Sequence, residues 1–327
     1  MPKISVIIPT YNCAQYIAEA IESVLNQAFK DIEIIVVDDG STDNTREILN
    51  LYIEKNIIKY IFQENKGPGA ARNAGIKASG GRFLAFLDAD DILLPKSLER
   101  KVEFLEKNRG VYLVFSDYFK QNDFDSLPKV GFLKERNLLN IFNSAIEKRE
   151  DDEIVFNHKK YFEIAIKDYV YIHTCGVLLR RVLIDRIGLF RTDFSIGEDN
   201  EFWFRICNQY DIGYIDKPLY LYRTYASNLT KNKLKFSENA IKYYDFMLKS
   251  YGTNGSIKKA LNKRLSDQHF WLGYCYMDNN MRRRALGQFV RSILSDPFNT
   301  ASWKYGVLGL MPKALSSFVK ANLLSKR

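Results

Sequence analysis

The sequence predicts an α/β fold in which a mostly parallel sheet carries helices on both faces, followed by a C-terminal helical appendage. Strand-length apolar runs alternate with helical patterns over residues 4–115, as they do in parallel sheets. Residues 231–327 show helical patterns only. The length of 327 residues suffices for one large α/β domain and a smaller one.

The predicted elements follow one another in chain order. Strands are expected at Ile4–Pro9, Ile32–Val37, Ile57–Phe62, Phe83–Leu87 and Val111–Phe115, with helices through residues 17–25 and at Asp43–Ile53, Ala70–Ala78 and Pro95–Lys107. Residues 120–170 are rich in Asn, Asp, Lys and aromatic residues, and they predict an insertion over the sheet edge. Beyond them, strands are expected at Tyr171–Leu179, Gly213–Ile215 and Leu219–Tyr222, and helices at Arg181–Ile187 and Glu198–Gln209. In the tail, Ala260–Met277 and Met281–Leu294 flank a turn at Asp278–Asn280 and predict an αα-hairpin.

The positive charge of the chain is concentrated in the predicted appendage. The whole sequence has 48 Lys and Arg against 39 Asp and Glu, a net charge of +9. Residues 231–327 hold 18 of these basic residues and only 5 of the acidic ones, so residues 1–230 carry a net charge of −4. Such asymmetry favours an anionic surface as partner, either a membrane or a nucleic acid.

Apolar segments and cysteines favour a cytoplasmic protein. The run Ile4–Pro9 is too short and has the wrong flanks for a signal peptide, and no run reaches the ~18 apolar residues of a membrane span. The four cysteines form no Cys-x-x-Cys pair, so we expect reduced, mostly buried thiols. None of the three histidines has the spacing of a zinc-binding pair with another His or Cys.

Polar residues directly follow four of the predicted strands. Because open α/β sheets bind ligands at the carboxyl ends of their strands, these residues are the first candidates for a site. One such turn would be ordinary, since Asp and Gly are common turn residues, but four in succession indicate a binding edge. The four segments are Pro9–Asn12, Asp38–Asp43, Asn65–Asn73 and Asp88–Asp91.

Asp88 and Asp90 are separated by a single alanine, Ala89, after the fourth strand. Two carboxylates placed in this way can share Mg²⁺ or Mn²⁺, whose other ligands are normally phosphate oxygens and water. A solvated turn or a helix cap would explain the pair equally well if it stood alone. The three other polar strand ends favour the metal.

Three further candidates have simpler alternatives. Asp39 is an acceptor suited to the N–H edge of a base, although an Asx turn would also use an Asp there. Arg72 supplies a permanent positive charge near Gly67-Pro68-Gly69, where the backbone can approach a ligand. Glu198 and Asp199 open a predicted helix, where the helix dipole alone would favour carboxylates.

Taken together, these motifs resemble the inverting family 2 glycosyltransferases of the GT-A fold. The resemblance covers about residues 3–225, and the motifs that carry it are P-T-Y-N, V-D-D-G-S-T-D, G-P-G-A-A-R-N, D-A-D, C-G-V-L-L-R-R, I-G-L-F and G-E-D, in this order. It implies a GT-A domain at 1–230, with a donor-binding half at about 1–118 and an acceptor and base half at about 119–230, ahead of the appendage at 231–327. It also implies transfer of a single sugar from a nucleotide diphosphate sugar, above all a UDP-sugar, to a hydroxyl of a glycan or lipid-linked acceptor in bacterial capsule, O-antigen or other surface polysaccharide synthesis.

The resemblance also implies a role for each matching residue. Thr10, Tyr11 and Asp39 would line the uridine pocket, with Asp39 reading the base. Asp88 would approach the ribose, and Asp90, with Asp88 beside it, would hold Mg²⁺ or Mn²⁺ on the diphosphate. Asp199 matches the catalytic base, which takes a proton from the acceptor hydroxyl. The other implied residues are Pro9, Gly69, Arg72, Asn73 and Ala89 on the nucleotide-sugar side, and Glu198 and Trp203 on the acceptor side.

One segment departs from the family pattern. Many members have a histidine in a Y-R-x-H segment that reaches the metal, where this chain has Tyr222-Arg223-Thr224-Tyr225. Neutral tyrosine is a poor ligand for Mg²⁺ or Mn²⁺, so we expect water in place of a third protein ligand. The chain also lacks a Q-x-x-R-W motif, which favours transfer of one sugar over processive synthesis.

The basic tail leaves two interpretations open. Leu315, Phe318, Val319 and Leu323 have the spacing of an interfacial helix, which together with Arg282-Arg283-Arg284 would dock the protein on an anionic membrane at the inner face of the plasma membrane. The alternative is the solvated face of an ordinary helical hairpin. Nucleic acid is not expected, because the tail resembles no nucleic-acid-binding motif.

Two other functions compete with sugar transfer. An inactive sugar-nucleotide-binding protein is disfavoured because Asp39, Asp88, Asp90 and Asp199 are all present. A nucleotidyltransferase is disfavoured by the Gly-Glu-Asp start of the helix at Asp199.

Overall fold

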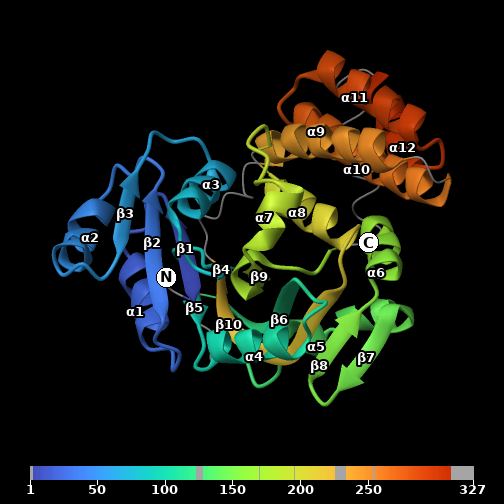
Figure 1. Cartoon of the computed structure of the whole chain (residues 1–327). Coiled ribbons are helices and arrows are strands. Elements are labelled where there is room, and N and C mark those ends of the chain that lie inside the picture. Colours follow the sequence, from blue (N-terminus) through green and yellow to red (C-terminus); the bar gives the residue numbers. More distant parts are fainter. Residues whose placement is uncertain are drawn as a thin grey trace. The chain divides into compact units, whose positions relative to one another are not determined.

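The computed structural model describes residues 3–122, 128–168, 170–194, 196–224, 233–252 and 255–310. The chain folds into two compact units, Met1–Ala226 and Ser227–Arg327 (Figure 1). The strands are β1 (Ile4–Thr10), β2 (Ile32–Asp38), β3 (Lys59–Phe62), β4 (Phe83–Phe86), β5 (Ile92–Leu93), β6 (Leu113–Asn122), β7 (Ile146–Glu150), β8 (Glu153–Phe156), β9 (Leu178–Arg180) and β10 (Ile212–Thr224). The helices of the first unit are α1 (Ile17–Leu25), α2 (Thr45–Glu54), α3 (Pro68–Ala78), α4 (Ser97–Lys107), α5 (Phe132–Glu135), α6 (His158–Lys167), α7 (Val182–Ile187) and α8 (Glu198–Cys207), with 3₁₀ turns η1 (Leu138–Ala145) and η2 (Thr174–Gly176).

The first unit is built on one mixed sheet. Within the described residues it has ten strands in the order β3-β2-β1-β4-β9-β6-β10-β8-β7, with β5 paired to β10 beside this path. Strands β3, β2, β1 and β4 run parallel, as do β6 and β10. The strands β9, β5 and the β7–β8 hairpin run antiparallel to their neighbours. This arrangement confirms the predicted mostly parallel sheet with flanking helices.

Helices cover both faces of the parallel strands. In β2, Ile34 and Val36 belong to the large buried cluster that includes the apolar side of α1. The alternate residues Ile35 and Val37 pack with Ala71 of α3. Because successive side chains of a strand point to opposite faces, α1 and α3 lie on opposite sides of the sheet.

Residues 120–170 differ from the prediction. Strand β6 continues to Asn122, and β7 and β8 form a hairpin that extends the sheet through pairing of β8 with β10. The outermost strand β7 has an almost wholly exposed, charged sequence, I-E-K-R-E, which protects a sheet edge against further pairing. Because β7 is charged and lacks the apolar pattern of a buried strand, the sequence predicted an insertion where the structure has an edge hairpin.

Two further strand predictions need correction. Tyr171–Leu179 forms the turn η2 and only the start of the short strand β9. The two strands predicted at 213–215 and 219–222 are one strand, β10, whose pairing with β6 shifts register around Pro218. Proline lacks the N–H that a regular ladder needs, which explains the irregularity.

The second unit consists of helices throughout its described part: α9 (Lys233–Tyr251), α10 (Gly255–Asp278), α11 (Arg282–Ser295) and α12 (Thr300–Leu310). The predicted αα-hairpin is α10–α11, and Leu272, Ala285, Phe289 and Leu308 form its core with α12. The predicted interfacial helix at 315–323 lies outside the described residues. Within the part that is described, no helix is both long and apolar enough to cross a membrane.

Candidate functional site

The carboxyl ends of β1, β2 and β4 lie at one edge of the sheet. Thr10 at the end of β1 is in register with Asp38 at the end of β2. The Asp39 amide donates to the Thr10 carbonyl at 2.8 Å, and the Leu87 amide donates to the Ile7 carbonyl at 3.0 Å. The polar segments after these strands are therefore neighbours in space, as the parallel topology predicts.

Asp39 is buried and holds a loop of its own chain. One oxygen, Oδ1, accepts from the Gln63 side chain at 2.6 Å and from the Lys66 amide at 2.9 Å. The other, Oδ2, accepts from the Gly67 amide at 2.8 Å. A carboxylate has about four acceptor positions, so these bonds fix the loop before α3 and leave at most one position for a ligand.

The three residues at the end of β1 have different exposures. Pro9 and Thr10 are buried, whereas Tyr11 is 46% exposed. The Thr10 hydroxyl is buried and has no hydrogen-bond partner in the structure. A buried hydroxyl without a partner is costly, and a ligand on this edge could supply the missing bond.

Arg72 connects the two halves of the candidate site. Its guanidinium is 5% exposed and forms ion pairs with Asp88 at 2.9 Å and Glu198 at 3.0 Å. Burial alone would raise the pKa of Asp88, but the charge of Arg72 holds it below its usual value. Burial, followed by the charge of Asp199, raises the pKa of Glu198 despite its pair with Arg72.

Four more residues with expected roles have close partners within the protein. Arg72 and Glu198 pair with each other, and both are buried. Asn73 exchanges two side-chain hydrogen bonds with the Phe190 backbone, at 2.8 and 2.9 Å. Trp203 is fully buried and packs edge-on against Phe86 and Phe190. Sequence patterns cannot separate such packing from binding.

Gly69 also has a packing role. A Cβ at this position would lie 3.0 Å from the Arg191 carbonyl and 3.1 Å from Glu198 Cγ. The glycine therefore lets the first turn of α3 approach the start of α8. Ala89 is buried between the two aspartates of the D-A-D segment.

Asp90 is the carboxylate whose environment best fits a cation. Burial, followed by the charge of Asp88, raises the pKa of Asp90 to about 6. Two carboxylates that oppose each other's ionisation are stabilised by a shared positive ion. Asp90, with Asp88 beside it, therefore fits Mg²⁺ or Mn²⁺, although Asp88 already has Arg72 as a partner.

Asp199 lies half-buried in the first turn of α8, after Gly197 with φ of 85°. Its Oδ1 accepts from the Asn200 amide at 2.7 Å, and its Oδ2 accepts from the Thr174 hydroxyl at 3.5 Å. Gly197 allows the left-handed turn that starts the helix. Asp199 thus differs from Glu198, because Arg72 pairs with Glu198 and not with Asp199.

A group that the sequence did not predict lies next to Asp90. Asp91, His173 and Cys175 come from the loop after β4 and from the segment around η2, and their ligand atoms lie within 4.8 Å of one another. His173 and Cys175 are two residues apart in sequence, a spacing that does not by itself predict a zinc-binding pair. The third member, Asp91, could be found only from the fold. Tyr225, the other residue considered for a metal, lies outside the described part of the chain.

The four cysteines all lie in the described part of the chain, and they form no disulfide there. Cys175 and Cys207 are buried, whereas Cys13 and Cys275 are partly exposed. The prediction of reduced thiols agrees with this arrangement, and the prediction of burial holds for two of the four.

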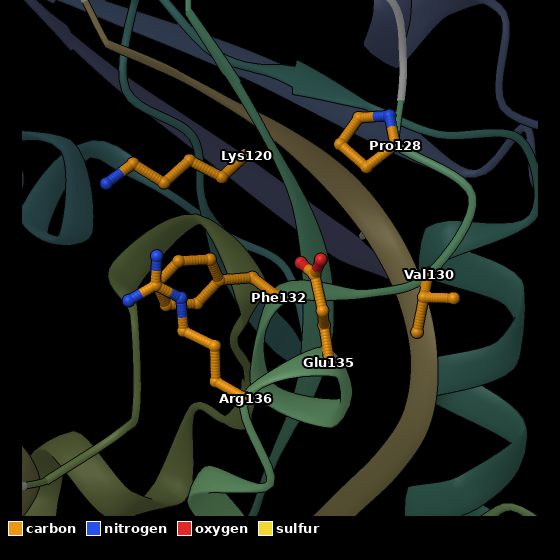
Figure 2. A pocket seen from close by; sticks show the side chains of 6 residues that line it. All are labelled: Lys120, Pro128, Val130, Phe132, Glu135 and Arg136. Atoms are coloured by element: carbon orange, nitrogen blue, oxygen red, sulfur yellow. The ribbon is translucent and has the colours of Figure 1, made fainter.

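A pocket of about 220 Å³ opens beside the end of β6 (Figure 2). The Phe132 ring has the Lys120 ammonium 5.3 Å and the Arg136 guanidinium 4.8 Å from its centroid. Phe132 also stacks on Tyr118 at 5.1 Å, and Tyr118 stacks on His173 at 5.7 Å. This row of rings connects the pocket to the segment that contacts Asp199. The pocket is lined by Lys120, Pro128, Val130, Phe132, Glu135 and Arg136.

A family model described as glycosyl transferase family 2 matches residues 5–187. The chain belongs to glycosyltransferase family 2. The chain is 32% identical over 286 residues to an uncharacterised glycosyltransferase of Methanocaldococcus jannaschii, a match that covers 84% of this chain and 86% of the relative. It is 31% identical over 271 residues to the uncharacterised glycosyltransferase EpsJ of Bacillus subtilis, which covers 80% and 74% of the two chains. The match to a Rickettsia felis glycosyltransferase, 32% identical over 251 residues, covers 75% of this chain but spans only 37% of that longer relative.

Solved structures share the GT-A fold with this chain. The S. aureus TarS 1–349 structure in complex with UDP-GlcNAc has a TM-score of 0.62 at 20% identity, covering 90% of this chain and 81% of that one. The mannosyltransferase PcManGT from Pyrobaculum calidifontis, in complex with GDP-Man and Mn²⁺, has a TM-score of 0.53 at 16% identity, with 98% and 83% covered. At these identities the likeness establishes the fold and not the substrate.

Proposed function

We propose that this glycosyltransferase is a metal-dependent, inverting enzyme that transfers one sugar from a nucleotide diphosphate sugar, with UDP as carrier, to a hydroxyl of a glycan or lipid-linked acceptor in surface polysaccharide synthesis. One observation carries the proposal: the Arg72 guanidinium pairs with one carboxylate from each of two acidic motifs, and a second carboxylate of each motif lies outside these ion pairs. Asp88 and Glu198 neutralise the buried guanidinium, and Asp90 and Asp199 stand next to them without sharing that ion pair.

On the donor side, the strand ends would bind the nucleotide. Thr10, Asp39 and Asp90 lie at or just beyond the carboxyl ends of neighbouring strands, and the buried Thr10 hydroxyl has no hydrogen-bond partner. Mg²⁺ or Mn²⁺ held by Asp90, with Asp88 beside it, would act as a Lewis acid that neutralises charge on the departing diphosphate.

On the acceptor side, Asp199 would accept the proton from the attacking hydroxyl. The Thr174 hydroxyl and the Asn200 amide orient its two oxygens. A single displacement with general-base help inverts the anomeric carbon, and this help is worth roughly 10²–10⁴-fold in rate. The pocket around Phe132 would bind the acceptor, because the row Phe132, Tyr118 and His173 leads from it toward Asp199.

We also propose that the second unit docks on an anionic membrane, where a lipid-linked acceptor would be found. Several large apolar side chains of this unit are exposed, including Leu294 at 77% and Phe298 at 86%. They occur in a unit that is rich in Lys and Arg. Exposed apolar side chains with basic residues are typical of an interfacial surface.

The transfer reaction is tested by incubating the full chain with a panel of nucleotide sugars and Mn²⁺. Release of a nucleoside diphosphate, with an acceptor product of inverted anomeric configuration by NMR, is expected from at least one donor. With pyrophosphate added in place of an acceptor, conversion of the nucleotide sugar to a nucleoside triphosphate and a sugar 1-phosphate would indicate a nucleotidyltransferase. Donor binding without any release, at every acceptor tried, would favour the inactive binding protein.

Membrane docking is tested by co-sedimentation with vesicles. We expect binding to vesicles containing phosphatidylserine that weakens with salt, and reduced binding for Leu294→Glu combined with Phe298→Glu. Each exposed Lys or Arg near such a surface contributes about 1 kcal/mol. Equal sedimentation with neutral and anionic vesicles would mean that the basic residues of the second unit form only a solvated helix face and do not bind anionic lipid.

A further inference from the structure

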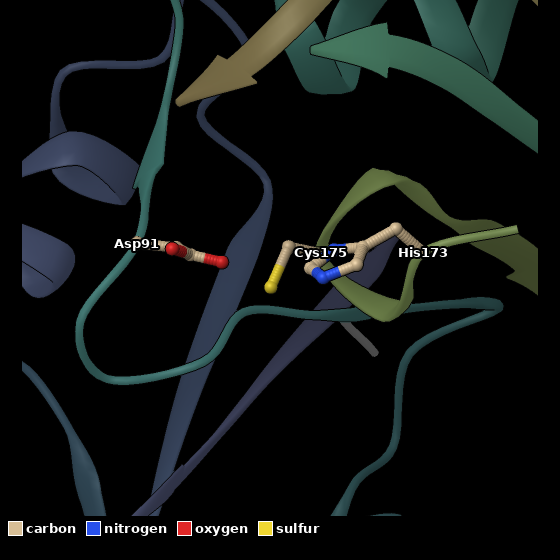
Figure 3. A group of neighbouring side chains, drawn as sticks. All are labelled: Asp91, His173 and Cys175. Atoms are coloured by element: carbon tan, nitrogen blue, oxygen red, sulfur yellow. The ribbon is translucent and has the colours of Figure 1, made fainter. Parts of the chain in front are cut away.

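Three side chains with different ligand atoms meet behind the D-A-D loop. Asp91 offers a carboxylate oxygen, His173 an imidazole nitrogen and Cys175 a sulfur, and these atoms all lie within 4.8 Å of one another (Figure 3). Asp91 follows β4, whereas His173 and Cys175 flank and form η2. The three residues are brought together by the sheet, across more than 80 residues of sequence.

Two atoms of this group have unused bonding capacity. Asp91 is 1% exposed, and its Oδ2 has no hydrogen-bond partner in the structure, so the weakly donating thiol of Cys175 is the side chain closest to a partner for this carboxyl. Nδ1 of His173 is likewise buried without a partner. Buried polar atoms normally have partners, and such atoms beside a thiol indicate that a ligand is missing from the group.

We propose that Asp91, His173 and Cys175 bind one divalent transition metal of the zinc class, at a site separate from the Mg²⁺ or Mn²⁺ site at Asp90. Sulfur, imidazole and carboxylate together form a donor set typical of Zn²⁺, whereas Mg²⁺ and Mn²⁺ prefer oxygen. Three protein ligands leave a fourth tetrahedral position for water. Binding replaces the thiol proton of Cys175, which passes to solvent.

The geometry needs only small adjustment. Zinc bonds of about 2.0–2.3 Å place tetrahedral ligand atoms about 3.3–3.8 Å apart, so no pair of ligand atoms has to close by more than about 1.5 Å. Other contacts already hold the ligands: the Arg223 amide donates to Asp91 Oδ1 at 3.0 Å, and the Asp88 amide donates to Cys175 Sγ at 3.2 Å. The His173 ring stacks on Tyr220 at 5.6 Å. Such outer contacts orient metal ligands in known sites.

A bound ion would tie together the two parts of the reaction site. Asp91 belongs to the same loop as Asp88 and Asp90, and Thr174, which contacts Asp199, lies between the other two ligands. The proposed ion is therefore structural: it fixes the strand-end loop against the segment that orients the candidate base.

Cobalt substitution tests this proposal independently of sugar transfer. Metal-free protein is titrated with Co²⁺, and we expect a thiolate-to-cobalt absorption band in the near ultraviolet that saturates at one equivalent and disappears on addition of excess Zn²⁺. Cys175→Ser and His173→Ala should abolish the band. Asp90→Asn should retain it, because an oxygen-only site gives no thiolate band.

Two cysteine controls make the result decisive. Cys207→Ser removes a buried thiol outside the group and should leave the band unchanged. Cys13→Ser removes the thiol whose pKa is raised in part by the charge of Asp90. If Cys13→Ser abolishes the band and Cys175→Ser does not, cobalt is bound near Asp90 and the proposal is wrong. The proposal also fails if folded wild-type protein, verified by circular dichroism, gives no band, since an S–H···O contact between Cys175 and Asp91 would then suffice.

Discussion

The loop after β4 and the start of α8 lie more than a hundred residues apart in sequence, yet they have the same arrangement. Each is acidic, and in each one carboxylate is paired with Arg72: Asp88 at 2.9 Å and Glu198 at 3.0 Å. Another carboxylate, Asp90 or Asp199, lies half-buried nearby and outside that ion pair. In each motif, therefore, one carboxylate neutralises Arg72, and we propose that the other takes part in the reaction.

The largest effect is expected within the α8 pair. Asp199→Asn keeps the shape but removes the proton acceptor, so turnover should fall by roughly 10²–10⁴-fold, while donor affinity changes little. Glu198→Gln instead weakens the Arg72 ion pair, so it should lower thermal stability as well as turnover. Steady-state kinetics, nucleotide titration and thermal melting of both variants separate the two roles. Near-normal turnover in Asp199→Asn would remove Asp199 as the base.

The next effect concerns Arg72 itself. Arg72→Met leaves the buried Glu198 and the partly buried Asp88 without their cation, and breaking a buried pair such as Arg72–Glu198 costs about 3–5 kcal/mol of unfolding free energy. Chemical denaturation measures the loss. Lys107→Ala is the control, because Lys107 pairs with Glu150 and Glu153 at the surface and surface pairs contribute little. Equal free energies of unfolding for the two variants would show that Arg72 does not stabilise the loop after β4 against the start of α8.

A smaller effect is expected from pH in the β4 loop. Burial, followed by the charge of Asp88, raises the pKa of Asp90 to about 6, so Mn²⁺-dependent nucleotide binding should weaken by up to about tenfold per unit as pH falls below 6. The folded, metal-free protein holds this proton more tightly than the unfolded chain. The contribution of protonated Asp90 to the free energy of unfolding is therefore fully present below about pH 4 and is lost as pH rises through 6.

Calorimetric titration of nucleotide with Mn²⁺ between pH 5 and 8 checks this dependence. Asp90→Asn should bind weakly at every pH and should lose the transition near 6. A transition that persists in Asp90→Asn would have to come from another group, and the cation site would then need a different ligand.

Sequence patterns predicted the regions but not the division of roles within them. Strand alternation placed Asp39, Asp88 and Asp90 at one edge because parallel topology brings carboxyl ends together. It could not indicate that Arg72 lies between two carboxylates, since only the fold brings Asp88 and Glu198 to the same guanidinium. Motif positions carry no information on burial, so the sequence could not indicate that Trp203 is fully buried or that Asn73 bonds to the Phe190 backbone. Asp91 joined no motif, and only the fold brings it to His173 and Cys175.

The smallest effect concerns the acceptor pocket, which lies outside both acidic pairs. Phe132→Leu keeps apolar volume but removes the ring face that Lys120 and Arg136 flank. One aromatic contact contributes about 0.5–1.5 kcal/mol, so the acceptor KM should rise roughly 2- to 10-fold while the donor KM stays constant. Arg136→Gln should act in the same direction. Arg186→Gln is the matched control, because Arg186 lies over the Tyr112 ring at 4.9 Å but does not line the pocket. If Arg186→Gln raises the acceptor KM as much as Arg136→Gln, or if Phe132→Leu changes the donor KM instead, the pocket is not the acceptor site.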